Sequence, residues 1–266
     1  MPREIISNVH WLYETGPDRS EMIEAMDPVP TWYDPDDPVY IPQCAYLIDG
    51  EEGCLLLDTL SPASRDQVLR ELDTLLDDDL DYLVVSHPDV PHAGNTGAIL
   101  AEHDAELIAP RYGDDHELYR LDEATLVGEG DSLVLGEYVV DFHEATFLDA
   151  PVSLWMSERT REMLFTVDWL GFPHHDAEAL RFVDELDEAL DGSRLFQFHG
   201  RVLFWHQYVD VAKVQQEIDR LYVAYEPEWL LPAHGLVVRE ETAGLFDLMK
   251  EIVAEIERRE RIGFLG

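Results

Sequence analysis

The chain has 266 residues, of which 57 are acidic and 18 are basic, so its formal net charge is −39 at pH 7. This charge argues against nucleic acid or an anionic membrane as a partner, because phosphate binding requires a basic surface. A hydrophobic content of 46% excludes a disordered chain. The length suffices for a large core, and we expect a single domain over residues 1–266.

The acidic residues are spread along the whole chain, whereas lysine occurs only at Lys213 and Lys250. An evenly acidic surface that is poor in lysine resembles the proteins of salt-accumulating halophiles. In molar salt the Debye length is about 3 Å, so such charges repel one another only weakly. We therefore expect the charge to reflect a halophilic habitat. We also expect a cytoplasmic protein, because the sequence shows neither a signal peptide nor an apolar run of membrane length.

Short apolar runs separated by turn residues dominate the first half of the chain. They predict strands at residues 5–13, 41–48, 54–58, 82–85 and 107–109, a helix from Ser61 onward, a helix at 95–103, and a long loop at 14–37. Ser61 is the expected N-cap of the first helix, and Pro62 is its expected first residue. Val68 and Leu72 would form part of its apolar stripe.

The second half continues this alternation. It predicts two or three strands within residues 126–142, further strands at 152–156, 163–167 and 229–231, and helices at 177–190, 209–222 and 240–261. Strands that alternate with helices in this way favour an α/β fold with mixed sheets and helices on the outside.

The two cysteines, Cys44 and Cys54, both lie in apolar strand-like runs. Their spacing is not that of a zinc-binding or redox-active pair. In a reducing compartment a disulfide is also disfavoured. We therefore predict two buried, reduced thiols without a role in chemistry.

The most informative stretch is SHPDVPHAGN at residues 86–95. It follows an apolar run that reads as a buried strand. A strand that ends in a turn bearing His87, Asp89 and His92 presents these side chains together, so they can converge on one metal ion. Pro91 stands where a further ligand would be expected, and proline has no side-chain donor.

Three later strand ends carry further candidate ligands, namely Asp149, Asp168 and His234. Taken singly, each is weak evidence. A lone strand-end aspartate is more often a turn or cap residue, and a lone buried histidine is more often a hydrogen-bonded core residue. Taken together with the turn at 86–95, their order along the chain favours a shared metal site.

These segments resemble the metallo-β-lactamase fold and, within it, the diiron domain of flavodiiron proteins. The superfamily carries His-x-His-x-Asp-His at a strand end, flavodiiron domains have Glu as the second ligand, and HPDVPH at residues 87–92 matches this frame. ATFLDAPVS, LFTVDWLG and PAHG resemble the segments with the later ligands, and the spacing of 19 from Asp149 to Asp168 agrees with the flavodiiron register. The resemblance covers about residues 8–240. It implies an αββα sandwich, in which two mixed β-sheets pack face to face with helices outside.

By this resemblance, one metal ion would be held by His87, Asp89, Asp149 and a bridging Asp168, and a second by His92, Asp168 and His234. Asp58 matches the early aspartate that supports such a site without binding metal. Two positions depart from the family pattern, since Pro91 replaces an aspartate ligand of the second metal and Asp149 replaces a histidine.

Asp89, Asp149 and Asp168 supply three carboxylates, as many as the family site contains. The first site is then rich in oxygen, which suits iron or manganese better than zinc. We expect two metal ions, iron first with manganese or zinc as alternatives, and no flavin bound by this chain. His143 is an alternative ligand near Asp149, although we expect it to be a solvent-facing strand residue.

Other histidines and aromatic residues admit several roles. His174 and His175 could line the entrance to the site, but a loop pair of this kind is more often on the surface. The aromatic runs at 196–199 and 204–208 could form a pocket wall or a dimer contact, and core packing is the expected role. Trp169, beside Asp168, is expected to shape a pocket for a small-molecule ligand.

The sequence leaves three functions open. The first is a flavodiiron-type dimetal protein that reduces or senses O₂ or NO and needs a separate flavodoxin-like or rubredoxin-like electron donor. The second is a metal-dependent hydrolase of esters, thioesters or lactones, for which Asp89 and Pro91 replace motif ligands. The third is a non-catalytic descendant that serves as a binding module. The resemblance also implies a homodimer.

Overall fold

A computed structural model describes residues 1–25, 29–111, 124–150, 152–187 and 189–259. Contacts between residues divide the chain into two units. The first unit comprises Met1–Glu14 and Gln43–Thr160, and the second comprises Thr15–Pro42 and Arg161–Gly266.

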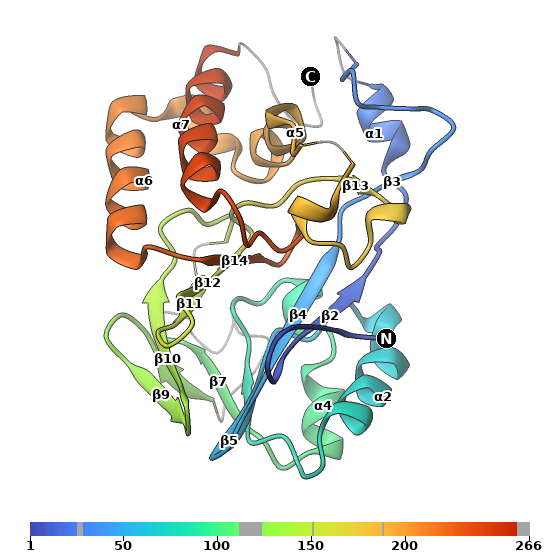
Figure 1. Cartoon of the computed structure of the whole chain (residues 1–266), viewed down its shortest axis with the longest axis vertical. Coiled ribbons are helices and arrows are strands. Elements are labelled where there is room, and N and C mark those ends of the chain that lie inside the picture. Colours follow the sequence, from blue (N-terminus) through green and yellow to red (C-terminus); the bar gives the residue numbers. More distant parts are fainter. Residues whose placement is uncertain (26–28, 112–123, 151, 188, 260–266) are drawn as a thin grey trace. The chain divides into compact units, whose positions relative to one another are not determined.

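A seven-stranded mixed sheet forms the centre of the first unit (Figure 1). In spatial order its strands are β1 (Arg3–Ile6), β2 (Val9–Glu14), β4 (Gln43–Gly50), β5 (Gly53–Leu57), β6 (Tyr82–Val84), β7 (Glu106–Pro110) and β8 (Thr125–Val127). The pairs from β1 to β5 are antiparallel, and those from β5 to β8 are parallel. β6 has parallel neighbours on both sides. Its mostly apolar side chains are those expected of a strand that is buried on both faces of a sheet.

Helices cover one face of this sheet. A 3-10 turn (Pro62–Ser64) leads into α2 (Arg65–Leu75), and α3 (Val90–Ala93) and α4 (Thr96–Glu102) follow β6. The buried side chains on this face include Leu12, Ala45, Leu47, Leu56, Val68, Leu72, Leu83 and Ile99. Strand residues that alternate with these are buried as well, among them Tyr46, Ile48 and Leu55. The opposite face of the sheet is therefore also covered.

Three more strands of the first unit form an antiparallel group: β9 (Ser132–Leu135), β10 (Tyr138–Glu144) and β11 (Leu154–Glu158). The Tyr138 hydroxyl donates to the Ser7 carbonyl, and the Leu154 amide donates to the Ser86 carbonyl at 2.9 Å. These bonds join the strand group to segments that flank the seven-stranded sheet. The predicted α/β class with mixed sheets and helices is confirmed.

The second unit contains a parallel pair, β12 (Met163–Val167) with β14 (Trp229–Pro232), and a short antiparallel pair, β3 (Val39–Tyr40) with β13 (His174–His175). Its helices are α1 (Ser20–Glu24), α5 (Gly192–Val202), α6 (Val211–Tyr225) and α7 (Thr242–Arg258), with 3-10 segments at Asp176–Glu178, Val183–Glu185 and Phe204–Tyr208. The Phe246 ring of α7 packs edge to face against Trp169 and Tyr222, with both centroid distances 5.2 Å.

One predicted helix is wrong, and the start of another differs from the prediction in one hydrogen bond. The described residues of 177–190 form no α-helix, because Leu180 has a left-handed φ of 54° and Phe182 is buried between Trp229 and the Arg239 guanidinium. Ser61 occupies the N-cap position of the 3-10 turn and Pro62 is the first residue of that turn, as predicted, but the Ser61 side chain makes no capping hydrogen bond. Its hydroxyl donates instead to Glu14, at 2.6 Å.

Two helices occur where the sequence predicts none. One is α1, which lies within the expected loop, and the other is α5, which spans the first aromatic run. The final helix, α7, ends at Arg258, and residues 260–266 lie outside the described part of the chain. Among the described residues, no helix combines the length and apolar character needed to cross a membrane.

Candidate metal centre

The first candidate ligand group lies where β6 leaves the core of the first unit. Leu83 and Val84 are fully buried in the sheet, and the chain then turns at Ser86 and His87, which are also fully buried. Asp89 is the exposed residue that precedes α3, with an extended backbone at φ −70° and ψ 154°. Hydrophobic burial of the strand thus fixes the start of the turn, and the exposed carboxylate follows two residues later.

His87, Asp89 and Asp149 come together in the structure. One ligand atom from each residue lies within 4.8 Å of the other two. The Nε2 atom of His87 is 3.7 Å from an oxygen of Asp149, whose side chain is 22% accessible. Two donors that each lie about 2.1 Å from one ion are separated by up to about 4.2 Å, so this spacing fits a shared metal ion.

His92 is oriented by the buried carboxylate of Asp58. The His92 Nδ1 lies 2.7 Å from an Asp58 oxygen, and both side chains are almost inaccessible. The backbone amide and hydroxyl of Ser86 also donate to Asp58, at 2.9 and 3.0 Å. A Nδ1–H bond to carboxylate leaves Nε2 as the metal-binding nitrogen, which is the usual role of such a supporting carboxylate.

Two further residues hold this turn, and the sequence did not single them out. The Thr59 hydroxyl donates to the His92 carbonyl at 3.0 Å and accepts the Asn95 amide at 3.0 Å. The Asn95 side-chain amide donates to the carbonyls of Thr59 and Ser61, at 2.9 and 2.7 Å. A buried asparagine directly after the ligand turn was the available signal.

Pro91 has a simple structural explanation. It lies in the first turn of α3, where a backbone N–H has no partner within the helix and its absence costs nothing. Its side chain offers no donor to a metal ion. The sequence indicated that one ligand is lost at this position, and the structure agrees.

The second ligand group, Asp168 and His234, belongs to the second unit. β12 and β14 are parallel, with Val167 opposite Pro232, so the residues that follow both strands emerge at the same edge. The His234 Nε2 lies 3.1 Å from an Asp168 oxygen, and both side chains are largely buried. The structure therefore brings these two predicted ligands together.

The hydrogen bond of His234 Nδ1 indicates which kind of group can lie between His234 and Asp168. Its Nδ1 lies 2.7 Å from the Pro42 carbonyl oxygen, so Nδ1 carries a proton that it donates. In the neutral ring Nε2 then presents a lone pair to a carboxylate oxygen. A metal ion or a second proton between the two atoms satisfies this arrangement, so the donor set fits a cation.

Other predicted residues are placed as follows. His143 lies on β10, 2.8 Å from the Ser157 hydroxyl and 3.5 Å from Glu129, and is half-buried. The expectation that His174 and His175 are on the surface is wrong, because both are buried in the β3–β13 pair. Burial lowers the pKa of His174 to about 4. Trp169 is fully buried against Phe246, so its ring belongs to the interior.

The two aromatic runs divide between the interior and the surface. Phe198 and His199 are buried, whereas Phe204 and Tyr208 are 54% and 81% exposed. The prediction of core packing is therefore confirmed for the first run and wrong for these two residues of the second. Cys44 and Cys54 are buried free thiols, as predicted, and burial raises their pKa values to about 12 and 11.

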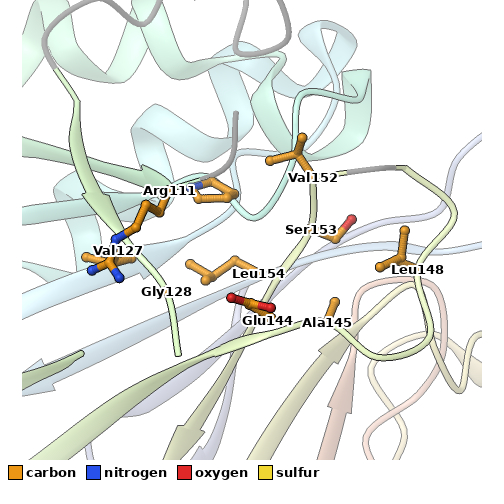
Figure 2. Close-up of a pocket in the computed structure, with 10 residues that line it drawn as sticks. Arg111, Val127, Gly128, Glu144, Ala145, Leu148, Val152, Ser153 and Leu154 are labelled. Carbon is orange, nitrogen blue, oxygen red and sulfur yellow. The ribbon is translucent and has the colours of Figure 1, made fainter. Parts of the chain in front are cut away.

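A small pocket of about 100 Å³ lies in the first unit (Figure 2). Its lining is mostly apolar and comprises Pro110, Arg111, Val127, Gly128, Glu144, Ala145, Leu148, Val152, Ser153 and Leu154. Leu148 precedes the candidate ligand Asp149, and Arg111 is paired with Asp131. This pocket differs from the one that the sequence placed beside Trp169.

Two curated relatives match most of the chain. One is a nitric oxide reductase of Moorella thermoacetica, 27% identical over 209 residues, which make up 76% of this chain and 51% of the relative. The other is a rubredoxin-oxygen oxidoreductase of Megalodesulfovibrio gigas, 24% identical over 217 residues, or 78% of this chain and 52% of the relative. The chain therefore spans about half the length of the curated relatives it matches.

The fold is similar to that of a rubredoxin oxygen:oxidoreductase from Desulfovibrio gigas, with a TM-score of 0.75 and 21% identity. The match covers 98% of this chain and 63% of that one. A flavodiiron protein from Giardia intestinalis also has this fold, with a TM-score of 0.71 and 20% identity over 97% of this chain and 59% of that one. The resemblance to flavodiiron domains is thus confirmed. The profile of the metallo-beta-lactamase superfamily matches residues 41–193, which is more than half of the chain. The chain belongs to the metallo-beta-lactamase superfamily.

Proposed function

We propose that the chain is a flavodiiron-type metal protein that binds two metal ions and acts on O₂ or NO. The observation that carries the proposal is the convergence of His87, Asp89 and Asp149 within 4.8 Å. The second ion is assigned to His92, Asp168 and His234, and the similarity to a nitric oxide reductase and a rubredoxin-oxygen oxidoreductase supports the reaction class.

Iron is the metal we propose, with manganese or zinc as alternatives. Asp89 and Asp149 give the first ligand group two carboxylates and one imidazole. Such a donor set suits iron or manganese better than zinc, which favours nitrogen and sulfur ligands. Bound iron would supply redox chemistry toward a diatomic ligand, and electrons would come from a separate flavodoxin-like or rubredoxin-like donor. We also propose a homodimer in the cytoplasm.

The protein's own residues have defined tasks in this function. Asp58 holds the His92 ring so that Nε2 is free of protons, and the Pro42 carbonyl does the same for His234. Asp149, which is partly accessible, supplies negative charge that Pro91 does not. His87 itself is fully buried, so its side chain is kept away from bulk water.

Elemental analysis of protein purified in molar salt tests the proposal. We expect close to two ions per chain, with iron or manganese predominant. Zinc together with esterase or lactonase turnover would instead establish the hydrolase. Protein that is folded at high salt and holds no metal would establish the non-catalytic module.

A matched pair of variants sharpens this test. Asp149→Ala removes one carboxylate of the first ligand group, and we expect it to lower affinity for the first ion about 10-fold to 100-fold. Glu144→Ala is the control, because Glu144 is an exposed carboxylate on β10, outside that group. Equal metal content in both variants would contradict the assignment of Asp149.

The halophilic interpretation of the charge is part of the proposal. With a net charge of −39, repulsion between carboxylates opposes folding at low ionic strength. We expect the urea midpoint of unfolding to rise steadily between 0.1 and 2 M KCl. A midpoint independent of salt would contradict this interpretation.

A further inference from the structure

The turn that carries Asp168 is strained. Val167 and Leu170, on either side of Asp168 and Trp169, have left-handed φ values of 53° and 71°. This conformation is unfavourable for bulky side chains and a genuine outlier for a β-branched one such as valine. Strained residues persist only where surrounding contacts hold them, and they cluster at functional sites. The position of Asp168 therefore depends on whatever holds this turn.

A buried histidine of α5, His199, accepts a hydrogen bond directly from the turn that carries Asp168. The backbone amide of Leu170 donates to Nε2 of His199 at 3.0 Å. The other ring nitrogen of His199, Nδ1, lies 2.8 Å from the Leu195 carbonyl in the same helix and donates to it. The two bonds fix a single tautomer, with Nε2 as the acceptor. His199 is fully buried, and burial lowers its pKa to about 4, so the ring stays neutral near pH 7.

The residue before His199 contacts the second ligand of the same group. The Phe198 ring lies 5.6 Å from the His234 ring and packs so closely on Gly171 that a Cβ there would be 2.5 Å from it. A side chain at position 171 would therefore require the Phe198 ring to move. Consecutive residues of one helix thus contact the segments that carry Asp168 and His234.

Backbone bonds join the two ligand segments to each other. The Ala233 amide donates to the Val167 carbonyl at 2.7 Å, and the Phe172 amide donates to the His234 carbonyl at 2.8 Å. The Thr166 hydroxyl closes the turn by donating to the Trp169 carbonyl at 2.7 Å. Among the hydrogen bonds described, the one to His199 connects the turn to a helix, and the Trp169 ring of the turn also packs on Phe246 of α7.

We propose that His199 is a positioning residue, which holds the Val167–Leu170 turn through its Nε2 and thereby sets Asp168 against His234. The inference rests on the proposed metal-binding function, because positioning matters when the pair binds an ion. It predicts that loss of the Nε2 acceptor weakens binding of the second metal ion more than binding of the first. Asp168 and His234 are two of the three ligands proposed for the second ion, whereas Asp168 is one of four proposed for the first.

Three variants of the whole chain separate this role from general stability. His199→Leu removes the acceptor and keeps an apolar side chain, whereas His199→Gln keeps an acceptor near the Nε2 position. His103→Leu is the matched control, since His103 is also buried and its ring nitrogen also accepts a backbone amide, that of Leu80, at 3.4 Å. His103 belongs to neither ligand group.

Anaerobic titration of metal-free protein with Fe²⁺ is the first measurement. We expect His199→Leu to bind the second ion about 10-fold to 100-fold more weakly, a loss typical of residues that support metal ligands. His199→Gln should recover most of this affinity, and His103→Leu should match the wild type even if it unfolds more easily. Wild-type affinity for the second ion in His199→Leu, or an equal loss for both ions, would overturn the inference.

The second measurement needs no metal, so it separates failure of the inference from failure of the proposed function. Amide exchange by NMR in the metal-free protein should show Leu170 protected in the wild type and in His199→Gln, and exposed in His199→Leu. The His234 ring signals should shift only in His199→Leu. Unchanged exchange and ring signals would overturn the positioning role, whatever metal the wild type binds.

Discussion

The two ligand turns of this protein are held in opposite ways. In the first unit no residue of 86–92, all of which are described, has a positive φ, and strain lies instead in the supporting segment, at Asp58 and Leu60. Side-chain hydrogen bonds from Asp58, Thr59 and Asn95 hold that turn. In the second unit the ligand-bearing turn is itself strained, and a helix distant in sequence holds it.

This difference separates two ways of fixing a metal ligand. A polar network around an unstrained turn places side chains by charge and hydrogen bonding, so its weak point is the buried carboxylate. A strained turn places its ligand through the backbone. It therefore depends on the contacts that keep φ in the left-handed region. Removing the key support from each turn should therefore have different consequences.

The largest effect is expected for Asp58→Ala. It leaves the Ser86 amide, the Ser86 hydroxyl and the His92 ring without the buried carboxylate they share. Breaking such a buried charged network costs about 4 kcal/mol. Urea unfolding at constant high salt should show this loss, and the control Glu71→Ala, which removes a less buried carboxylate of α2, should cost much less. A loss below about 1 kcal/mol would show that the first turn does not depend on Asp58.

Acidification tests the support of the second turn. The pKa of His199 is lowered by burial to about 4 in the folded chain, against 6.5 when exposed. Above pH 6.5 the ring is neutral in both states. As the pH falls from 6.5 to 4, only the unfolded chain takes up this proton, so stability falls by about 3 kcal/mol, at about 1.4 kcal/mol per pKa unit.

His199→Gln separates this contribution from the many carboxylates. It retains an acceptor but has no group that titrates in this range. We expect a shallower decline of the unfolding free energy between pH 6.5 and 4 than in the wild type, measured by urea unfolding at fixed salt. Parallel declines would mean that the His199 ring does not stay neutral in the folded chain.

The same contrast explains what the sequence could reveal. The residues of the first turn are neighbours in the chain, after an apolar strand, so the spacing from His87 to His92 indicated a metal site directly. The fold class followed from alternating strands and helices. His199 gave no such signal, because it lies 29 residues from Leu170 and its helix was not recognised among the aromatic residues. Contacts made by folding, such as the burial of Phe182 that replaces the expected helix, cannot be derived from local patterns.

The smallest effect measures the cost of left-handed backbone where no ligand depends on it. Glu226 follows α6 with a φ of 38°, is exposed, and donates its amide to the Tyr222 carbonyl as a left-handed helix end. Glu226→Gly should raise the unfolding free energy by about 1 kcal/mol, since glycine adopts this conformation freely. Glu228→Gly is the control, at an exposed position outside the positive-φ set. If Glu226→Gly stabilises the chain no more than Glu228→Gly does, a left-handed backbone costs little free energy in this unit. The left-handed residues Val167 and Leu170 would then need little support from His199.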